Sequence, residues 1–303
     1  LRFSQALVAI LAVTFACALP ISGVSAAEEE QMCGSRIDAA PPQPRQINIV
    51  LDDSGSMFAS ATTSLDRWSN AKYSLEVFAA MLDKEDRLNV YRTSDFDTGA
   101  SSGPAVTMAG KEPASQRVAK IHQMPMQGGG TPYEPVGVAL ADLSASASPD
   151  RWLVVLSDGE FNNVPTSTVE SDLAEAVASN RTESTSLRVA FLAIGAEAPQ
   201  LTNNPAGGVV FEHAKQTADL LGKMTEFSNR IFARSLLPQT TPGSINVDID
   251  LDEVLVFAQG EKVSIGAFSQ NGQSLKAASE VGVSWATNPD AMSGGISVPA
   301  VPN

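Results

Sequence analysis

The chain has 303 residues, of which 43% are hydrophobic and 18% are charged, and its formal net charge at pH 7 is −14. That length and apolar fraction are enough for one full domain and a smaller one. The acidic balance argues against nucleic acid and anionic membrane surfaces as partners.

Residues 1–26 carry one charge, Arg2, followed by an apolar run that ends in small residues. This pattern predicts a secretory signal peptide, and therefore a secreted or cell-surface protein. An uncleaved membrane anchor is the alternative, because the apolar run approaches the length that spans a bilayer. Cleavage would remove Cys17 and leave Cys33 as a single cysteine, so we expect no intrachain disulfide.

The next two segments differ sharply in composition. Residues 27–45 are acidic and then proline-rich, which predicts an extended linker. Residues 46–237 alternate between apolar runs and amphipathic stretches. We expect strands at 47–51, 87–93, 105–108, 152–156, 187–194 and 208–212, and helices at 66–82, 112–124, 133–145, 168–179 and 218–236. The alternation predicts an α/β fold with a doubly wound, mostly parallel sheet and helices on both faces.

Residues 238–303 begin with a linker-like Thr-Thr-Pro-Gly sequence and continue with several strand-like runs. They predict a small β-rich segment, part of an antiparallel β domain. A unit of this size without a disulfide is marginal on its own. We therefore expect it to pack on the first domain or to be cut short.

The first predicted strand, 47–51, ends at the sequence Asp52-Asp53-Ser54-Gly55-Ser56. Asp52, Ser54 and Ser56 place one carboxylate and two hydroxyls at alternate positions of a tight loop. All three are hard oxygen donors, which suit a small divalent cation such as Mg²⁺. The alternative is an Asx or Ser turn that caps a helix.

Two later positions repeat this chemistry. Asp158 follows the strand 152–156, and Thr131 follows the glycines 128–130. In a doubly wound sheet with strand order 3-2-1-4-5-6, the first and fourth strands are neighbours, and ligands bind at their carboxyl ends. Two carboxylates in one crevice repel each other unless a cation lies between them. Taken singly, Thr131 reads as a helix N-cap and Asp158 as part of a turn; together with the first loop they predict a metal site.

These three motifs resemble the metal-ion-dependent adhesion site of von Willebrand factor A (VWA) domains. The resemblance covers about residues 46–236 and is nearer to exported bacterial members than to integrin domains. It implies that five residues bind the ion directly or through water: Asp52, Ser54, Ser56, Thr131 and Asp158. It also implies that Mg²⁺, with Mn²⁺ or Ca²⁺ as alternatives, keeps one position open for a partner carboxylate. Relatives with this layout often continue to a membrane anchor beyond the β-rich segment.

Other sites fit the sequence poorly. A serine hydrolase needs a histidine near its nucleophile, and we expect His122 and His213 to be structural. The glycines 128–130 lack the Lys-Ser or Lys-Thr of a phosphate-binding loop. We therefore expect a binding protein rather than an enzyme, whose partner is a protein that offers an acidic side chain. A structural envelope or pilus-like protein and a metal-dependent enzyme subunit are the alternatives.

Overall fold

The computed structural model describes residues 43–57, 67–99, 102–159, 161–182, 184–195, 198, 200–216 and 219–233. It also describes the backbone of β1 (Leu7–Ala12) and of the strands that follow residue 234. The predicted cleavage of the signal peptide, the linker up to residue 42 and Cys33 lie outside these residues.

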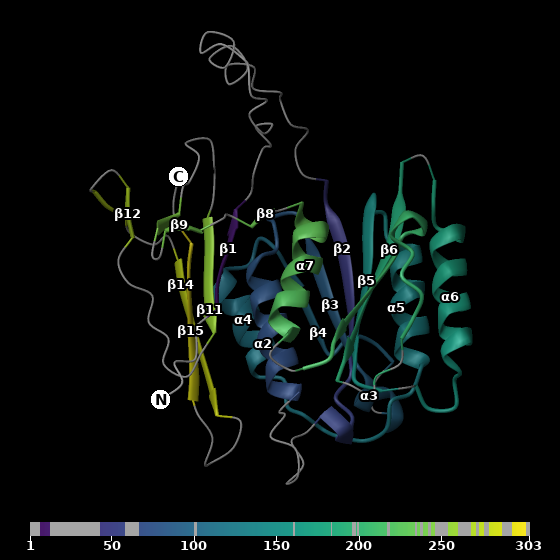
Figure 1. The fold of residues 1–303 in the computed structure, drawn as a ribbon. Coiled ribbons are helices and arrows are strands. Elements are labelled where there is room, and N and C mark those ends of the chain that lie inside the picture. The colour runs from purple at the N-terminus through teal and green to yellow at the C-terminus, as the bar shows by residue number, and fades with distance from the viewer. Residues whose placement is uncertain are drawn as a thin grey trace.

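A six-stranded sheet forms the centre of the chain, with the strand order β4-β3-β2-β5-β6-β7 (Figure 1). All neighbours pair in parallel except β3 and β4, which are antiparallel. This is the predicted order 3-2-1-4-5-6. The strands are β2 (Arg45–Leu51), β3 (Arg87–Arg92), β4 (Val106–Ala109), β5 (Asp150–Ser157), β6 (Ser186–Ile194) and β7 (Val209–Ala214).

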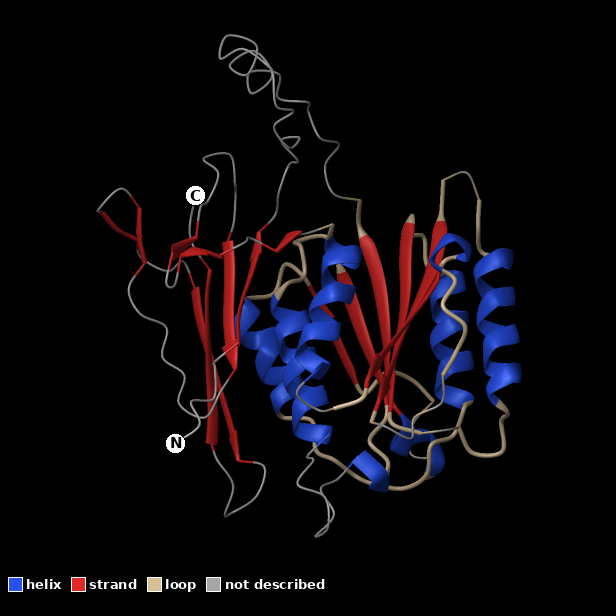
Figure 2. Cartoon of the chain, in the orientation of Figure 1, coloured by secondary structure: helices blue, strands red, loops and turns tan. Residues whose placement is uncertain are grey.

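Helices cover both faces of this sheet, as the sequence predicts (Figure 2). The helices are α2 (Arg67–Ala80), α3 (Thr93–Asp97), α4 (Ala114–His122), α5 (Glu134–Ala145), α6 (Thr166–Ser179) and α7 (Leu220–Phe232). Every residue of β2 is buried, because its alternate side chains enter two separate cores. Ile49 packs with residues of α2, α4 and α7, whereas Val50 packs with residues of α5 and α6. The result is the expected α/β sandwich.

Most element boundaries lie within about two residues of those predicted, and two of the differences have a clear structural reason. The helix expected at 218–236 ends at Phe232, because Ala233 adopts a left-handed conformation with φ of 51°. The chain then forms the short strand β8 (Ser235–Leu236). The strand expected to reach Thr93 ends one residue earlier, where α3 begins. That five-residue helix was not predicted, because it is too short to show helical periodicity.

Beyond the main sheet, the described strands pair antiparallel. They are β9 (Gln239–Thr241), β10 (Ser244–Ile245), β11 (Val254–Gln259), β12 (Phe268–Gln270), β13 (Gln273–Leu275), β14 (Ser279–Ala286) and β15 (Ser293–Ala300). One sheet has the order β14-β15-β11-β1-β8, so that a strand from the predicted signal peptide pairs with β11 and β8. The sequence did not predict β15. The boundaries drawn at residues 26, 45 and 237 remain predictions.

None of the helices that the structure describes is both long and apolar enough to cross a membrane.

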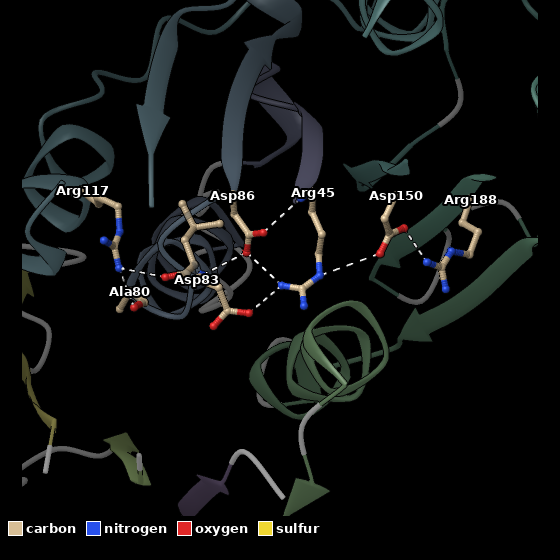
Figure 3. Close-up of polar contacts among 8 residues, drawn as sticks. Arg45, Ala80, Asp83, Asp86, Arg117, Asp150 and Arg188 are labelled. Carbon is tan, nitrogen blue, oxygen red and sulfur yellow. Dashed lines mark hydrogen bonds and ion pairs between the residues drawn. The ribbon is translucent and has the colours of Figure 1, made fainter. Parts of the chain in front are cut away.

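The amino ends of the central strands carry a partly buried charge cluster (Figure 3). Arg45, the first residue of β2, donates from Nη1 to Asp83 Oδ2 at 2.7 Å and to Asp86 Oδ2 at 2.9 Å. Its Nε lies 3.8 Å from Asp150 Oδ2, and Asp150 also pairs with Arg188. The cluster thereby connects β2, β5, β6 and the turn before β3 at one edge of the sheet. The candidate site lies at the opposite edge.

Candidate metal centre

The site is built where β2 and β5 end side by side. Leu51 is the register partner of Leu156, and the backbone N–H of Asp52 donates to the carbonyl of Leu156 at 2.9 Å. The strand pairing therefore carries Asp52 and Asp158 to the same edge of the sheet. The loops that follow these strands lie beside α3 in Figure 1.

The carboxylate of Asp52 is fully buried and held by neighbouring donors. The backbone N–H of Ser54 donates to Oδ1 at 2.9 Å, and the hydroxyl of Ser157 donates to Oδ2 at 2.7 Å. Burial raises the pKa of Asp52, the donors from Ser157 and Ser54 oppose that rise, and the negative charge of Asp158 adds to it. The carboxylate thus sits where a nearby cation would stabilise its charged form.

The two serines of the first loop connect Asp52 to Asp158. The hydroxyl oxygens of Ser54 and Ser56 lie 3.0 Å apart, and the Ser56 hydroxyl donates to Asp158 Oδ1 at 2.9 Å. Ser54 and Asp158 are buried, whereas Ser56, in the 3-10 turn η1 (Gly55–Met57), is exposed. Four of the five predicted oxygen donors therefore form one continuous group with an exposed side.

Backbone contacts bring the third loop against the other two. The N–H of Gly55 donates to the carbonyl of Gly129 at 3.2 Å, and the N–H of Asn162 donates to the carbonyl of Thr131 at 2.8 Å. Thr131 itself is buried. The loop that carries the fifth predicted donor is thus fixed to both of the loops that carry the other four.

The donor set fits a hard divalent cation. It offers two carboxylates and three hydroxyls, all oxygen, which Mg²⁺ accepts while keeping water or a further ligand. Among the residues that the structure describes, no group of three or more His, Cys, Asp or Glu side chains is placed to hold a metal. The predicted site has two carboxylates, and its other donors are hydroxyls, so it is not a group of that kind.

Several contributing residues were not predicted from the sequence. Ser157 donates to Asp52, and Asp97 accepts from the backbone N–H of Gly130 at 2.9 Å. Asp53 is buried and accepts from the backbone N–H of Ser94 at 2.9 Å and from its hydroxyl at 2.6 Å. Asp53 belongs to the first-loop motif, and Ser157 is signalled by the pairing of Leu51 with Leu156, which brings Ser157 beside Asp52.

Arg67, the first residue of α2, also reaches the site. Its guanidinium pairs with Asp158 and donates to the carbonyl of Ser56 at 3.3 Å. Nothing in the motif spacing indicates this contact, because it depends on where α2 begins.

The two histidines lie in other surroundings. His122, at the end of α4, has its Nδ1 atom 3.0 Å from Glu76 Oε1 on α2. His213, in β7, has its Nε2 atom 2.5 Å from the carbonyl of Gly195. Both contacts join secondary-structure elements, as expected for structural histidines.

Comparisons with known proteins give matches among solved structures alone. No family model matches the chain, and no curated protein matches it significantly. Among solved structures, the PilB minor pilin of Streptococcus sanguinis is similar with a TM-score of 0.41 and 13% identity, over 64% of this chain and 63% of that one. A von Willebrand factor type A protein of Catenulispora acidiphila gives a TM-score of 0.44 and 16% identity, over 86% and 58%.

The vWF domain of the type V pili tip protein Mfa5 of Porphyromonas gingivalis gives a TM-score of 0.41 and 11% identity, over 64% of this chain and 97% of that one. The chain thus spans less than two thirds of the first two of these structures. Similarity at such TM-scores does not establish a family or a function for this chain. The description of the fold therefore rests on its own strand order and layers.

Proposed function

We propose that this chain is an exported, metal-dependent protein-binding module that captures an acidic side chain of a partner protein. Five residues would hold Mg²⁺, with Mn²⁺ or Ca²⁺ as alternatives: Asp52, Ser54, Ser56, Thr131 and Asp158. The proposal places the protein outside the cytoplasm, in secreted form or at the cell surface. It assigns a binding role rather than catalysis.

One contact carries the proposal more than any other. The hydroxyl of Ser56 donates to Asp158 across a sequence separation of 102 residues. A turn or helix cap would satisfy these side chains locally, within a few residues. A metal ion bound by two loops instead requires a hydroxyl of one loop to lie close to a buried carboxylate of the other, although the two are far apart in the sequence.

The exposure pattern supports capture of an external group. Asp52, Ser54, Thr131 and Asp158 are buried, whereas Ser56 faces the surface. A bound Mg²⁺ would supply a Lewis-acidic coordination position at this face for a carboxylate oxygen. The chain's own residues would hold the ion on its buried side, and the exposed side would be available to a partner.

Paired peptides test this function. A set of Asp- or Glu-bearing peptides, each with an Asn or Gln twin, is presented to the full chain in Mg²⁺ and in chelator. We expect retention of some acidic peptides but not of their amide twins, only in Mg²⁺, and its loss in Asp52→Ala. Equal retention of both twins, or retention that chelator leaves unchanged, would contradict the proposal.

The same variant separates capture from a purely structural metal. If Asp52→Ala lowers thermal stability and peptide retention is unaffected, the ion serves the fold, as in the pilus-like alternative. If the variant stays folded by circular dichroism and retention disappears, capture is supported.

A further inference from the structure

Arg67 places a fixed positive charge at the candidate metal centre. Its Nη1 atom pairs with Asp158 Oδ2 and also donates to the carbonyl of Ser56 at 3.3 Å. The side chain of Asp158 is fully buried, whereas that of Arg67 is 23% exposed. The guanidinium therefore reaches from the rim of the site down to its buried carboxylate.

The end of β6 makes room for this side chain. Gly195 has φ of +100°, and a Cβ atom added there would lie 3.0 Å from Nη2 and 3.1 Å from Cζ of Arg67. The guanidinium thus fills space that the side chain of any residue other than glycine at position 195 would need. Its position is defined by α2, β5 and β6 together.

The two oxygens of Asp158 have different partners. Oδ1 accepts from the Ser56 hydroxyl, on the side of the predicted metal ligands, and Oδ2 faces Arg67. A buried carboxylate is costly unless hydrogen-bond donors or a nearby positive charge stabilise it. In the protein without metal, Arg67 provides that charge.

We infer that Arg67 is a built-in counter-cation, which competes with the metal for Asp158 and so sets the metal affinity of the site. The inference rests on the proposed function. A divalent ion that shares Asp158 with a guanidinium is repelled by it across a short, poorly hydrated distance. Arg67 thereby stabilises the metal-free site and weakens metal binding.

The test compares three full-length variants with the wild type by isothermal titration with Mg²⁺ and by thermal unfolding in chelator. Arg67→Gln removes the charge, Arg67→Lys retains it, and Arg188→Gln is the matched control. Arg188 also pairs with an aspartate, Asp150, but at the opposite edge of the sheet.

We expect Arg67→Gln to bind Mg²⁺ roughly tenfold more tightly than the wild type, because the competing charge is gone. Its melting temperature in chelator should fall, and saturating Mg²⁺ should raise it by more than in the wild type. Arg67→Lys should keep an affinity close to that of the wild type. Arg188→Gln should keep the wild-type affinity whatever its stability.

Unchanged or weaker Mg²⁺ binding by Arg67→Gln would overturn the inference, since weaker binding would make Arg67 a residue that positions Asp158 for the metal. Tighter binding by Arg67→Lys to the same degree as by Arg67→Gln would also overturn it. Failure of the proposed function has a different signature. In that case the wild type either binds no Mg²⁺ or binds it as well as Asp52→Ala does.

Discussion

At the scale of single residues, Asp52 depends on a neighbour that is not a predicted metal ligand. The hydroxyl of Ser157 lies 2.7 Å from Asp52 Oδ2, and both side chains are buried. A hydrogen bond to a buried charged group contributes more than one between neutral groups. Ser157 therefore supports the carboxylate before any metal arrives.

Ser157→Ala should lower the free energy of unfolding of the metal-free protein by about 1–3 kcal/mol, because Asp52 loses a buried donor. Ser144→Ala is the matched control, since the exposed Ser144 hydroxyl donates only to the carbonyl of Leu140 within α5. We expect that control to stay within about 0.5 kcal/mol of the wild type in urea unfolding. Equal effects of the two substitutions would show that Ser157 contributes nothing specific to Asp52.

At the scale of loops and helices, the segment that carries Thr131 is fixed by glycine. Gly129 has φ of +117°, and a Cβ atom there would lie 2.7 Å from Asp97 Oδ2. Asp97 in turn accepts from the backbone N–H of Gly130. A side chain at Gly129 would therefore strain the backbone and displace the carboxylate that orients the loop.

Gly129→Ala and Gly137→Ala should have opposite effects on stability. We expect Gly129→Ala to destabilise the protein by about 1–3 kcal/mol, because the added methyl group strains the backbone and collides with the Asp97 carboxylate. Gly137 lies exposed in α5 with nothing within 4 Å of its Cβ position, so its substitution should stabilise by about 0.5–1 kcal/mol. Denaturant unfolding of both variants measures the difference. Destabilisation by Gly137→Ala would contradict the view that Gly129 needs to be glycine and Gly137 does not.

The contact between α2 and α4 contains a buried acid. The side chain of Glu76 is 2% exposed, its Oε1 lies 3.0 Å from His122 Nδ1, and its buried Oε2 has no hydrogen-bond partner within the described part of the chain. Burial raises the pKa of Glu76 to about 7, although His122 and Lys72 lower it. The folded protein therefore holds this proton more tightly than the unfolded chain does.

Stability from Glu76 should be complete below about pH 4.5 and should be lost as the pH rises through about 7. Glu76→Gln removes the ionisation, so we expect it to gain up to about 3 kcal/mol over the wild type at pH 8. That advantage should disappear by about pH 4, below the ordinary pKa of 4.5. Urea unfolding at the two pH values measures it, and a pH-independent difference would refute the assignment to Glu76.

At the scale of the whole molecule, the two ends of the central sheet have different roles. The amino edge holds the ion pairs around Arg45 (Figure 3), and the carboxyl edge holds the oxygen donors and Arg67. Burial raises the pKa of Asp86 to about 6 even though Arg45 opposes that rise. At the amino edge Arg45 pairs with Asp83 and Asp86. At the carboxyl edge Asp158 pairs with Arg67 through one oxygen and accepts from the exposed Ser56 hydroxyl through the other.

Much of this arrangement was predictable from sequence, because it depends on local patterns. Apolar runs such as 47–51 identified the buried strands, and their alternation with helices indicated a doubly wound sheet. The strand order of that fold brings Asp52 and Asp158 to one edge. Arg67 and Asp97 could not be predicted in the same way. Their contacts depend on where helices begin and on how loops fold back, and no local pattern determines either.

The central claim is that the carboxyl edge of the sheet binds a divalent cation through three loops. Isothermal titration of the full chain with Mg²⁺ tests it most directly, beside Asp52→Ala and Thr131→Ala, which remove donors from separate loops. The account predicts one saturable site in the wild type, which both substitutions abolish or greatly weaken. Absence of binding at millimolar Mg²⁺, or equal binding by all three proteins, would reduce the constellation to caps and turns.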